Sequence, residues 1–339
     1  MTINKIKYCD VLIVGGTIGG CTSAITLSDM GFKVILSEST KWIGGQLTSQ
    51  GVPPDEHPWA ERFGFTKMYQ NFRNRIRQYY RENIPLLKII SDDPFFNPGG
   101  GYASRLCHDP RIAHKIILEM MLPAISNDFI ELLLNRELKS AESDRDKVQV
   151  VELLDTTSGN TEQIFAPFYV DATDLGDLLP LINAEYVVGS ESINDTQEPH
   201  AKGNSSNPDN VQAFTWPIGV GYDENNLDII EKPQHYNFWR DFTPKLNPPW
   251  NGKLLDWKRP RGTNNKQIDT VLFSHEASSE NDVNSIFNLR QVISKNNHPP
   301  GTFSFDVTTL NCSQNDFFLG NIIDKTEKDV ETNDKDYVF

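Results

Sequence analysis

A short apolar strand that runs into a glycine-rich turn constrains the fold of this chain more than any other feature. Residues 10–14 (DVLIV) lead into GGTIGG at 15–20, and small and apolar residues recur at helical spacing over 18–30. Gly31 is placed to end that helix, and residues 33–36 (KVIL) form a second apolar run. Strand, tight turn, helix and strand make one βαβ unit, which predicts an α/β fold with a parallel sheet.

Each position of the glycine-rich turn has a physical role in binding a dinucleotide. Gly15 permits the tight turn out of the strand, the backbone near Thr17 approaches a pyrophosphate, and Gly20 lets the helix pack closely on the sheet. Glu38 ends the second strand, next to Ser39, where it can accept both hydroxyls of an adenosine ribose. Because helix N-termini bind phosphate, the predicted pyrophosphate contacts are Gly15, Gly16, Thr17, Ile18, Gly19 and Gly20.

One position departs from the usual G-x-G-x-x-G pattern. Thr17 stands where the middle glycine is expected. Its Cβ narrows the approach to the pyrophosphate, although its hydroxyl can donate to a phosphate oxygen. The strand before the turn, the helix after it and the acid at the right distance favour dinucleotide binding over a merely structural glycine turn.

Glu38 and three further features separate the possible dinucleotides. Glu38 disfavours NADP, because a 2′-phosphate would face its carboxylate, but it does not distinguish FAD from NAD. The motif begins almost at the N-terminus, and residues 43–47 (IGGQL) soon follow, where paired glycines let the backbone pass against a large flat ring. Residues 171–173 (DAT) end a predicted strand where large flavoproteins complete the dinucleotide site. These features favour FAD, and an NAD-dependent dehydrogenase is the weaker alternative.

Longer segments carry a resemblance to a known family. DVLIVGGTIGG, VILSES, WIGGQLTSQG and VDATDLGDLLPLINAEYVVGSES resemble FAD-dependent oxidoreductases with a glutathione-reductase-like FAD domain, and EPHAKG, FNLRQVI and PPGTFSFDVTTLNCSQNDFFLG extend the similarity over most of residues 8–323. The resemblance implies flavin-side contacts near Gly45, Gln46 and Leu47, and places Ala172 and Thr173 beside the cofactor. For Asp177 it implies a polar cofactor contact or a supporting role, with a helix N-cap as the alternative.

The expected architecture has a regular first part and an irregular second part. Residues 1–180 are predicted to form a Rossmann-like FAD-binding domain with a three-layer ββα core. It includes inserted helices at about 60–125, one of them starting at Pro110 after an Asp109 cap, and a β-meander over 129–171 with strands 129–134, 148–154 and 164–171. Residues 181–324 are expected to form a substrate-binding or cap-like region, and residues 325–339 a disordered tail.

Charge and cysteine content exclude several classes of function. The net charge is −14, and no Lys/Arg cluster reverses it, which disfavours nucleic acid and anionic membranes as partners. Arg73, Arg75, Arg77 and Arg81 are expected on a solvated helix face. The four cysteines lie far apart without a CxxC, so neither a metal site nor a redox dithiol is predicted. With no signal peptide or membrane span indicated, the expected location is the cytoplasm.

The predicted function is a flavin-dependent oxidoreductase that transfers hydride to or from a small organic substrate. The flavin ring does the chemistry, so no catalytic residue is assigned. Structural roles are favoured for the histidines and tryptophans, and nothing selects a substrate-carboxylate ligand among Arg73, Arg105 and Arg111. Because the resembling proteins are longer, the alternative is an incomplete or non-catalytic FAD-domain half that needs a separate C-terminal partner chain, and a homo-oligomer is also possible. The histidines and tryptophans considered are His57, His108, His200, His235, His275 and His298, with Trp216, Trp239, Trp250 and Trp257.

Overall fold

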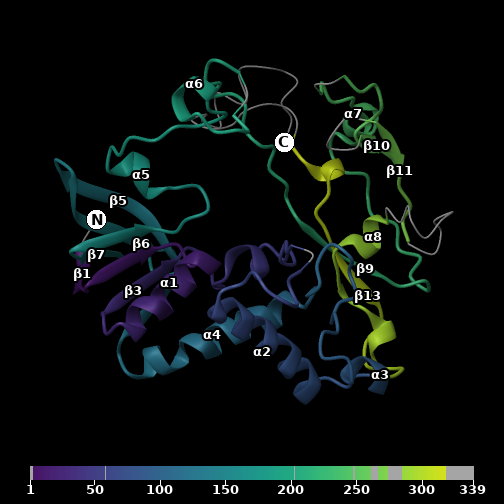
Figure 1. Ribbon diagram of the computed structural model, residues 1–339, viewed down its shortest axis with the longest axis horizontal. Helices are drawn as coiled ribbons and strands as arrows, with labels where there is room; N and C mark the ends of the chain where they lie inside the picture. The colour runs from purple at the N-terminus through teal and green to yellow at the C-terminus, as the bar shows by residue number, and fades with distance from the viewer. Residues whose placement is uncertain are drawn as a thin grey trace. The chain divides into compact units, whose positions relative to one another are not determined.

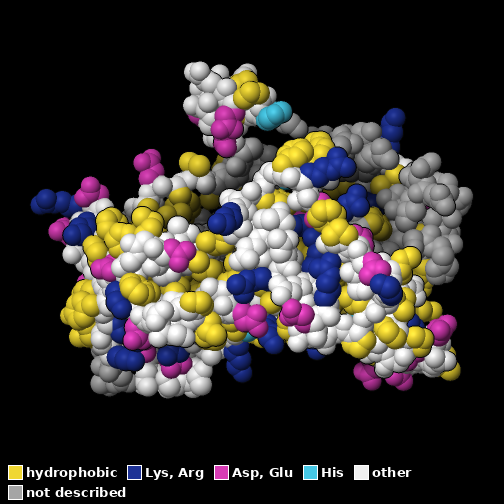
Figure 2. Space-filling view, turned by 60° about the horizontal axis from the view of Figure 1, so that its bottom comes forward, with side chains coloured by type: hydrophobic (Ala, Val, Ile, Leu, Met, Phe, Trp, Pro, Cys, Tyr) yellow, Lys and Arg dark blue, Asp and Glu magenta, His cyan; other side chains and the backbone are white. Residues whose placement is uncertain are grey.

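The computed structural model describes most of the chain. The described residues are 3–57, 59–201, 203–246, 249–260, 266–273 and 285–317. None of the helices within these ranges is both long and apolar enough to cross a membrane. Charged side chains of both signs are interspersed with apolar ones over the face drawn in Figure 2. The predicted C-terminal tail, 325–339, lies outside the described residues.

The chain divides into two compact units. The sequence predicts a separate region over 181–324, but residues 290–308 of that region belong to the same unit as the N-terminal part of the chain. Hydrogen bonds hold this returning segment: Leu87 N–H donates to the Asn297 carbonyl at 3.0 Å, and the Asn297 side chain donates to the Pro98 carbonyl at 2.8 Å. Unit 1 contains residues 1–185 and 290–308, and unit 2 contains residues 186–289 and 309–339.

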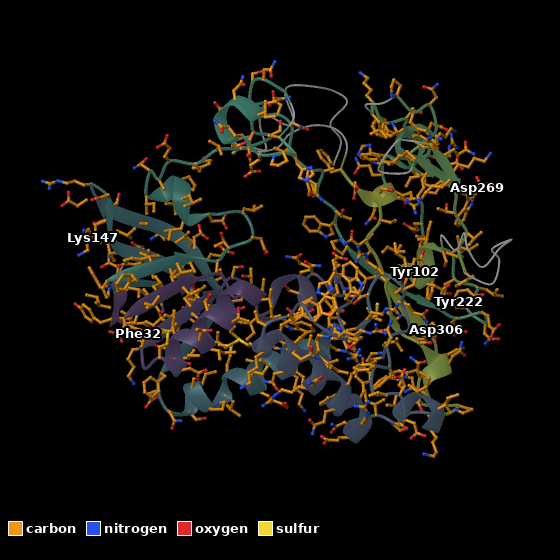
Figure 3. All side chains as sticks on the ribbon, viewed as in Figure 1. Phe32, Tyr102, Lys147, Tyr222, Asp269 and Asp306 are labelled. Atoms are coloured by element: carbon orange, nitrogen blue, oxygen red, sulfur yellow. The ribbon has the colours of Figure 1, made fainter. Side chains whose placement is uncertain are left out.

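The central layer of unit 1 is a four-stranded parallel sheet. Its strands, in spatial order, are β4 (Ile130–Leu134), β3 (Val34–Glu38), β2 (Val11–Val14) and β8 (Phe168–Asp171). Strands β2 and β3 are buried along their whole length, as their apolar runs predict. Helix α1 (Ile18–Asp29) connects them, and Phe32 lies in the turn between α1 and β3 (Figure 3).

Helices cover one face of this sheet. Buried Ile13 and Leu36 of the sheet pack with α1, with α2 (Lys67–Asn83) and with α4 (Pro110–Ser126) in one apolar cluster. Helix α4 begins at Pro110, as predicted, and the Asp109 carboxylate caps it by accepting the Arg111 N–H at 2.9 Å. The helical layer therefore follows closely from the sequence.

A second sheet covers the opposite face. Buried Leu12 and Ile35 of the parallel sheet pack against Val151 and Ile164 of the second sheet, which gives the three-layer ββα arrangement that the sequence predicts (Figure 1). Lys147 lies at the tip of its outer hairpin (Figure 3). The strands are β1 (Ile3–Tyr8), β7 (Thr161–Phe165), β6 (Lys147–Asp155) and β5 (Arg136–Asp144), antiparallel except for the β1–β7 pair.

The predicted meander over 129–171 is wrong at both ends. Its first strand is β4 of the parallel sheet, and the predicted strand 164–171 is two strands, β7 and β8, separated at Ala166-Pro167. Proline has no N–H to donate, so a ladder is readily interrupted there. Strands β1 and β5 have polar sequences with little alternation, and pairing with β7 and β6 rather than their own pattern makes them strands.

The remaining elements are short. Unit 1 also contains two short 3₁₀-helices, labelled η1 (Gly45–Leu47) and η3 (Lys295–Asn297), and two short α-helices, α3 (Lys88–Ser91) and α5 (Leu178–Leu181). Its remaining strand is β12 (Gln291–Ile293), with which β13 (Asp306–Leu310) pairs. Unit 2 contains α6 (Ile193–Thr196), β9 (Ile218–Tyr222), α7 (Tyr236–Asp241), β10 (Lys258–Pro260), β11 (Gln267–Asp269), α8 (Ile286–Leu289) and η4 (Ser313–Asn315). Aromatic packing is prominent in unit 2, where Trp239 lies against Phe238 and Phe242.

Candidate cofactor site

The predicted site residues gather where β2, β3 and β8 reach their carboxyl ends. Gly15 has a φ of +100°, and a Cβ on it would lie 2.5 Å from the backbone nitrogen of Thr173. A Cβ on Gly20 would overlap the Gly15 carbonyl oxygen, so α1 packs closely against the turn. Open α/β sheets bind ligands beyond this edge. The glycines are therefore required by close backbone approaches, as the sequence predicts.

Glu38 is buried at the end of β3 and faces the turn. One carboxylate oxygen accepts the Gly16 N–H at 3.0 Å. The other accepts the Thr40 N–H at 2.8 Å and the Ser39 hydroxyl at 3.4 Å. Each carboxylate oxygen has two acceptor sites, so these three bonds leave one site, on the oxygen that accepts the Gly16 N–H, for a ligand hydroxyl. The carboxylate is held in a fixed position beside the first strand's end.

Thr17 occupies the position of the missing glycine and caps α1. Its hydroxyl accepts the Gly20 N–H at 3.2 Å and donates to the Ala172 carbonyl at 2.8 Å. A threonine hydroxyl has one proton. The predicted donation from this hydroxyl to a phosphate oxygen is therefore wrong for this geometry, because the proton is already engaged.

The paired glycines after β3 lie against the same turn. Gly44 and Gly45 have φ values of +108° and +52°, and the Gly44 N–H donates to the Gly16 carbonyl at 2.6 Å. Leu47 is buried, whereas the Gln46 side chain donates to Asp55 at 3.3 Å. Helix η1, which holds the predicted flavin-side residues, is thus tied to the phosphate-side turn.

The segment after β8 completes the cluster. Asp171 accepts the Thr173 N–H at 2.9 Å and its hydroxyl at 2.7 Å, and also accepts the Leu178 N–H at 2.9 Å. Asp177 is at the N-cap position of α5, but its side chain makes no capping bond, so the N-cap alternative is wrong and Asp171 accepts the first N–H of the helix instead. Burial, and then the charge of Glu38, raises the pKa of Asp174, which accepts a bond from Gln50 at 3.2 Å.

The prediction of a solvated arginine face is wrong for Arg73 and Arg77, which lie in a buried ion network, and right for Arg75 and Arg81, which are exposed. Arg73 pairs with Glu56 and Glu61, and Arg77 pairs with Glu61 at 2.5 Å. Burial, and then the charge of Arg77, lowers the pKa of Arg73 to about 10. Glu56 and Glu61 come from the loop between η1 and α2, so the helical pattern of α2 does not reveal these ion pairs. Arg73 is therefore committed to internal pairing, and Arg111 pairs with Asp109 at 2.5 Å.

Two of the candidate histidines, His57 and His108, have structural surroundings. His57 lies among aromatic rings, and its Nδ1 accepts the Trp59 N–H at 3.2 Å. His108 is buried, its Nδ1 is 2.7 Å from the Leu106 carbonyl oxygen, and burial lowers its pKa. His275 lies outside the described residues. Burial also raises the pKa of Cys107 to about 12, so its thiol is protonated at neutral pH.

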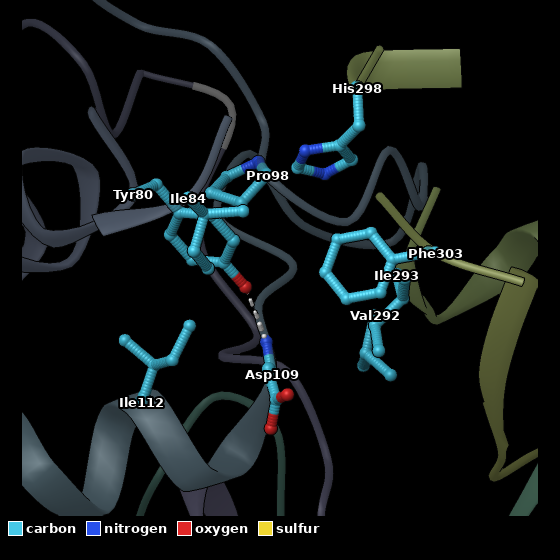
Figure 4. Close-up of a pocket in the computed structure, with 9 residues that line it drawn as sticks. All are labelled: Tyr80, Ile84, Pro98, Asp109, Ile112, Val292, Ile293, His298 and Phe303. Carbon is cyan, nitrogen blue, oxygen red and sulfur yellow. Dashed lines mark hydrogen bonds between the residues drawn. The ribbon is translucent and has the colours of Figure 1, made fainter. Parts of the chain in front are cut away.

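A small pocket in unit 1 is a poor candidate for catalysis. Its walls are mainly aliphatic and aromatic (Figure 4). The Tyr80 hydroxyl accepts the Asp109 N–H at 2.9 Å, and His298 Nδ1 lies 2.7 Å from the Pro85 carbonyl oxygen. The polar groups that border the pocket thus pair with the protein. No group of three or more acids, histidines or cysteines in the described part of the chain is arranged to hold a metal ion.

Comparison with known families decides what the clustered residues belong to. Residues 10–335 match the family described as FAD dependent oxidoreductase. The chain belongs to this family. Membership identifies FAD as the cofactor of this oxidoreductase, as the sequence predicts. No curated protein matches the chain significantly.

Solved structures similar to this FAD-dependent oxidoreductase are distant. L-proline dehydrogenase from P. horikoshii is 16% identical with a TM-score of 0.28, and the match covers 50% of this chain and 23% of that one. Glycerol-3-phosphate dehydrogenase from Bacillus halodurans, complexed with FAD, is 17% identical with a TM-score of 0.31, covering 49% and 34%. Mycobacterium smegmatis Sdh1 in complex with UQ1 is 12% identical with a TM-score of 0.33, covering 50% and 34%. The matched part thus spans between 23% and 34% of the length of these proteins.

The residues at the sheet edge fit FAD. Gly15 and Gly20 leave no side chain where the turn meets α1 and Ala172, and a Cβ on Gly45 would lie 3.4 Å from the Thr17 Cα. The N-terminus of α1 offers backbone N–H groups to a pyrophosphate, and Glu38 offers a fixed carboxylate. The cofactor-binding role of each individual residue stays a prediction.

Proposed function

We propose that this chain is an oxidoreductase that transfers hydride between a small organic substrate and FAD. One observation carries the proposal. The phosphate-side turn, Glu38, the paired glycines before η1 and the segment after β8 converge at one edge of the parallel sheet, joined by the Gly44–Gly16 and Thr17–Ala172 bonds. This edge is where α/β folds bind dinucleotides.

Each group has a distinct task in holding FAD. The N–H groups of Ile18 and Gly19 face the pyrophosphate, and Glu38 accepts a ribose hydroxyl. The backbone of residues 45–47 lines the flavin side, and residues 172–173 lie beside the cofactor. When bound, FAD supplies the group that accepts or gives the hydride. The protein orients the cofactor and excludes water, so the proposal assigns no catalytic side chain.

The test changes the ribose contact by one atom. In Glu38→Gln one carboxylate oxygen becomes an amide nitrogen, which cannot accept a hydrogen bond and so also leaves either the Gly16 or the Thr40 N–H without its acceptor. Circular dichroism of the variant checks that the fold is kept. A hydrogen bond to a charged group contributes about 1.5–3 kcal/mol, so the Kd for FAD should rise by about tenfold or more. Titration of FAD against the apoprotein, followed by flavin fluorescence, measures this change. Glu38→Ala is a poorer choice because it also leaves the Gly16 and Thr40 N–H groups without their acceptor.

A matched control makes the test specific. Glu137→Gln makes the same change at an exposed position in β5, and its Kd for FAD should equal that of the wild type. An unchanged Kd in Glu38→Gln would show that the ribose is bound elsewhere. Membership of an FAD-dependent family favours FAD over the NAD alternative. A separate partner chain or a homo-oligomer stays a prediction, which a lone monomer with full flavin occupancy and turnover would exclude.

A further inference from the structure

Thr17 lies against two parts of the site that are distant from it in sequence, Ala172 and Gly45. We propose that Thr17 is a positioning residue that holds the phosphate-binding turn in its FAD-binding shape by tying it to the segment after β8. The inference rests on the proposed function and goes beyond it, because the dinucleotide motif treats this position as one where a side chain is an obstacle. Thr17 would instead contribute to binding.

The hydroxyl joins two structural elements at once. It donates to the Ala172 carbonyl at 2.8 Å, a partner 155 residues away, and accepts the Gly20 N–H at 3.2 Å. The backbone at Thr17 is extended, with φ of −61° and ψ of 173°, which is ordinary geometry for an N-cap. No strain accompanies the side chain, so its effect on the turn comes from these bonds.

These bonds also decide which N–H groups remain for a ligand. Gly16 donates to Glu38, Gly20 donates to the Thr17 hydroxyl, and Cys21 donates to the Thr17 carbonyl at 2.9 Å. Helix N-termini leave their first N–H groups without partners inside the helix. Within the described residues, the capping therefore leaves Ile18 and Gly19 at the start of α1 for the pyrophosphate.

The rest of the Thr17 side chain faces the flavin-side segment. A Cβ on Gly45 would lie 3.5 Å from the Thr17 Cβ and Cγ2, so the two backbones are in near contact. Thr17 thus borders the paired glycines with its carbon atoms and the segment after β8 with its hydroxyl. Both neighbouring segments are predicted to contact the cofactor.

Three substitutions separate the hydroxyl from the bulk of the side chain. Thr17→Ser keeps the hydroxyl and should leave the Kd for FAD within about twofold of the wild type. Thr17→Val keeps the shape but removes both bonds, and Thr17→Gly restores the common motif while removing the cap. In both, the Kd for FAD should rise by about tenfold or more, as measured by flavin fluorescence on samples shown to be folded by circular dichroism.

Thr26→Val is the matched control, because it removes a hydroxyl bond to the Thr22 carbonyl within the same helix on an exposed face. Its Kd for FAD should not change. The inference is overturned if Thr17→Gly binds FAD as tightly as the wild type or more tightly. Should Thr17→Val fail to fold, the comparison of Thr17→Ser with Thr17→Gly decides. Wild-type protein that does not bind FAD would instead refute the proposed function.

Discussion

One methyl group added at Gly20 should disrupt the packing of α1 on the parallel sheet. The Cβ of an alanine there would overlap the Gly15 carbonyl oxygen. It would also lie 3.2 Å from the Gly15 carbonyl carbon and 3.3 Å from the Ala172 Cβ. Backbone atoms cannot rotate away as a flexible side chain can, so α1 or the turn must shift. The phosphate-binding turn would shift with them.

The size of the effect follows from two opposing contributions. Overpacking of a close contact costs about 1–3 kcal/mol. Replacing glycine by alanine inside a helix returns up to about 1 kcal/mol. Gly19→Ala is the matched control, since it lies in the same turn, is exposed, and its Cβ would be 3.7 Å from the Thr17 hydroxyl oxygen. The gain from the helix propensity of alanine is common to both variants and cancels, so the difference in unfolding free energy between them should be about 1–3 kcal/mol.

Urea unfolding of the two apoproteins, followed by circular dichroism, measures this difference. Gly19→Ala should be at least as stable as the wild type, and Gly20→Ala clearly less stable. Equal midpoints and slopes for Gly20→Ala and Gly19→Ala would refute the reasoning, because the close approach of helix and turn would then not constrain the fold. Stability of the apoprotein is the relevant quantity, since Gly19 is itself a predicted cofactor contact.

Two further predictions concern the buried charges and histidine of unit 1. Arg77→Met should lower the unfolding free energy by about 3 kcal/mol, because it leaves the partly buried Glu61 with one arginine fewer; a loss below 1 kcal/mol in urea unfolding would count against a tightly coupled network. Burial lowers the pKa of His108 below 6.5, so the folded protein resists protonation and its stability should fall as pH drops below that value, by up to about 1.4 kcal/mol per pH unit. His108→Gln should reduce the loss of stability between about pH 7.5 and about pH 5.5, and an unchanged loss would assign it to other groups.

The sequence predicts best those features that depend on neighbours in the chain. The βαβ unit depends on local apolar runs and on glycines at fixed offsets, and the Asp109 cap and Pro110 start of α4 are equally local. These elements are confirmed. Strands β1 and β5 are polar and acquire their conformation from distant partners, so no local pattern indicates them.

The candidate site likewise combines residues that local sequence patterns predict with contacts that depend on distant parts of the chain. The glycines and Glu38 are recognisable because the motif sets their spacing, and the structure brings them to one sheet edge. The partner of the Thr17 hydroxyl is 155 residues away, and the acids that pair with Arg73 lie in a separate loop. Contacts of this kind depend on how the layers pack, which periodicity and spacing do not specify.

The absorbance spectrum of the purified chain, taken after FAD is added and the excess is removed, tests the central claim most directly. The convergence of the glycine-rich turn, Glu38 and the paired glycines at one sheet edge predicts stoichiometric flavin absorbance that persists through the removal step. A folded but colourless protein after this treatment would contradict the account.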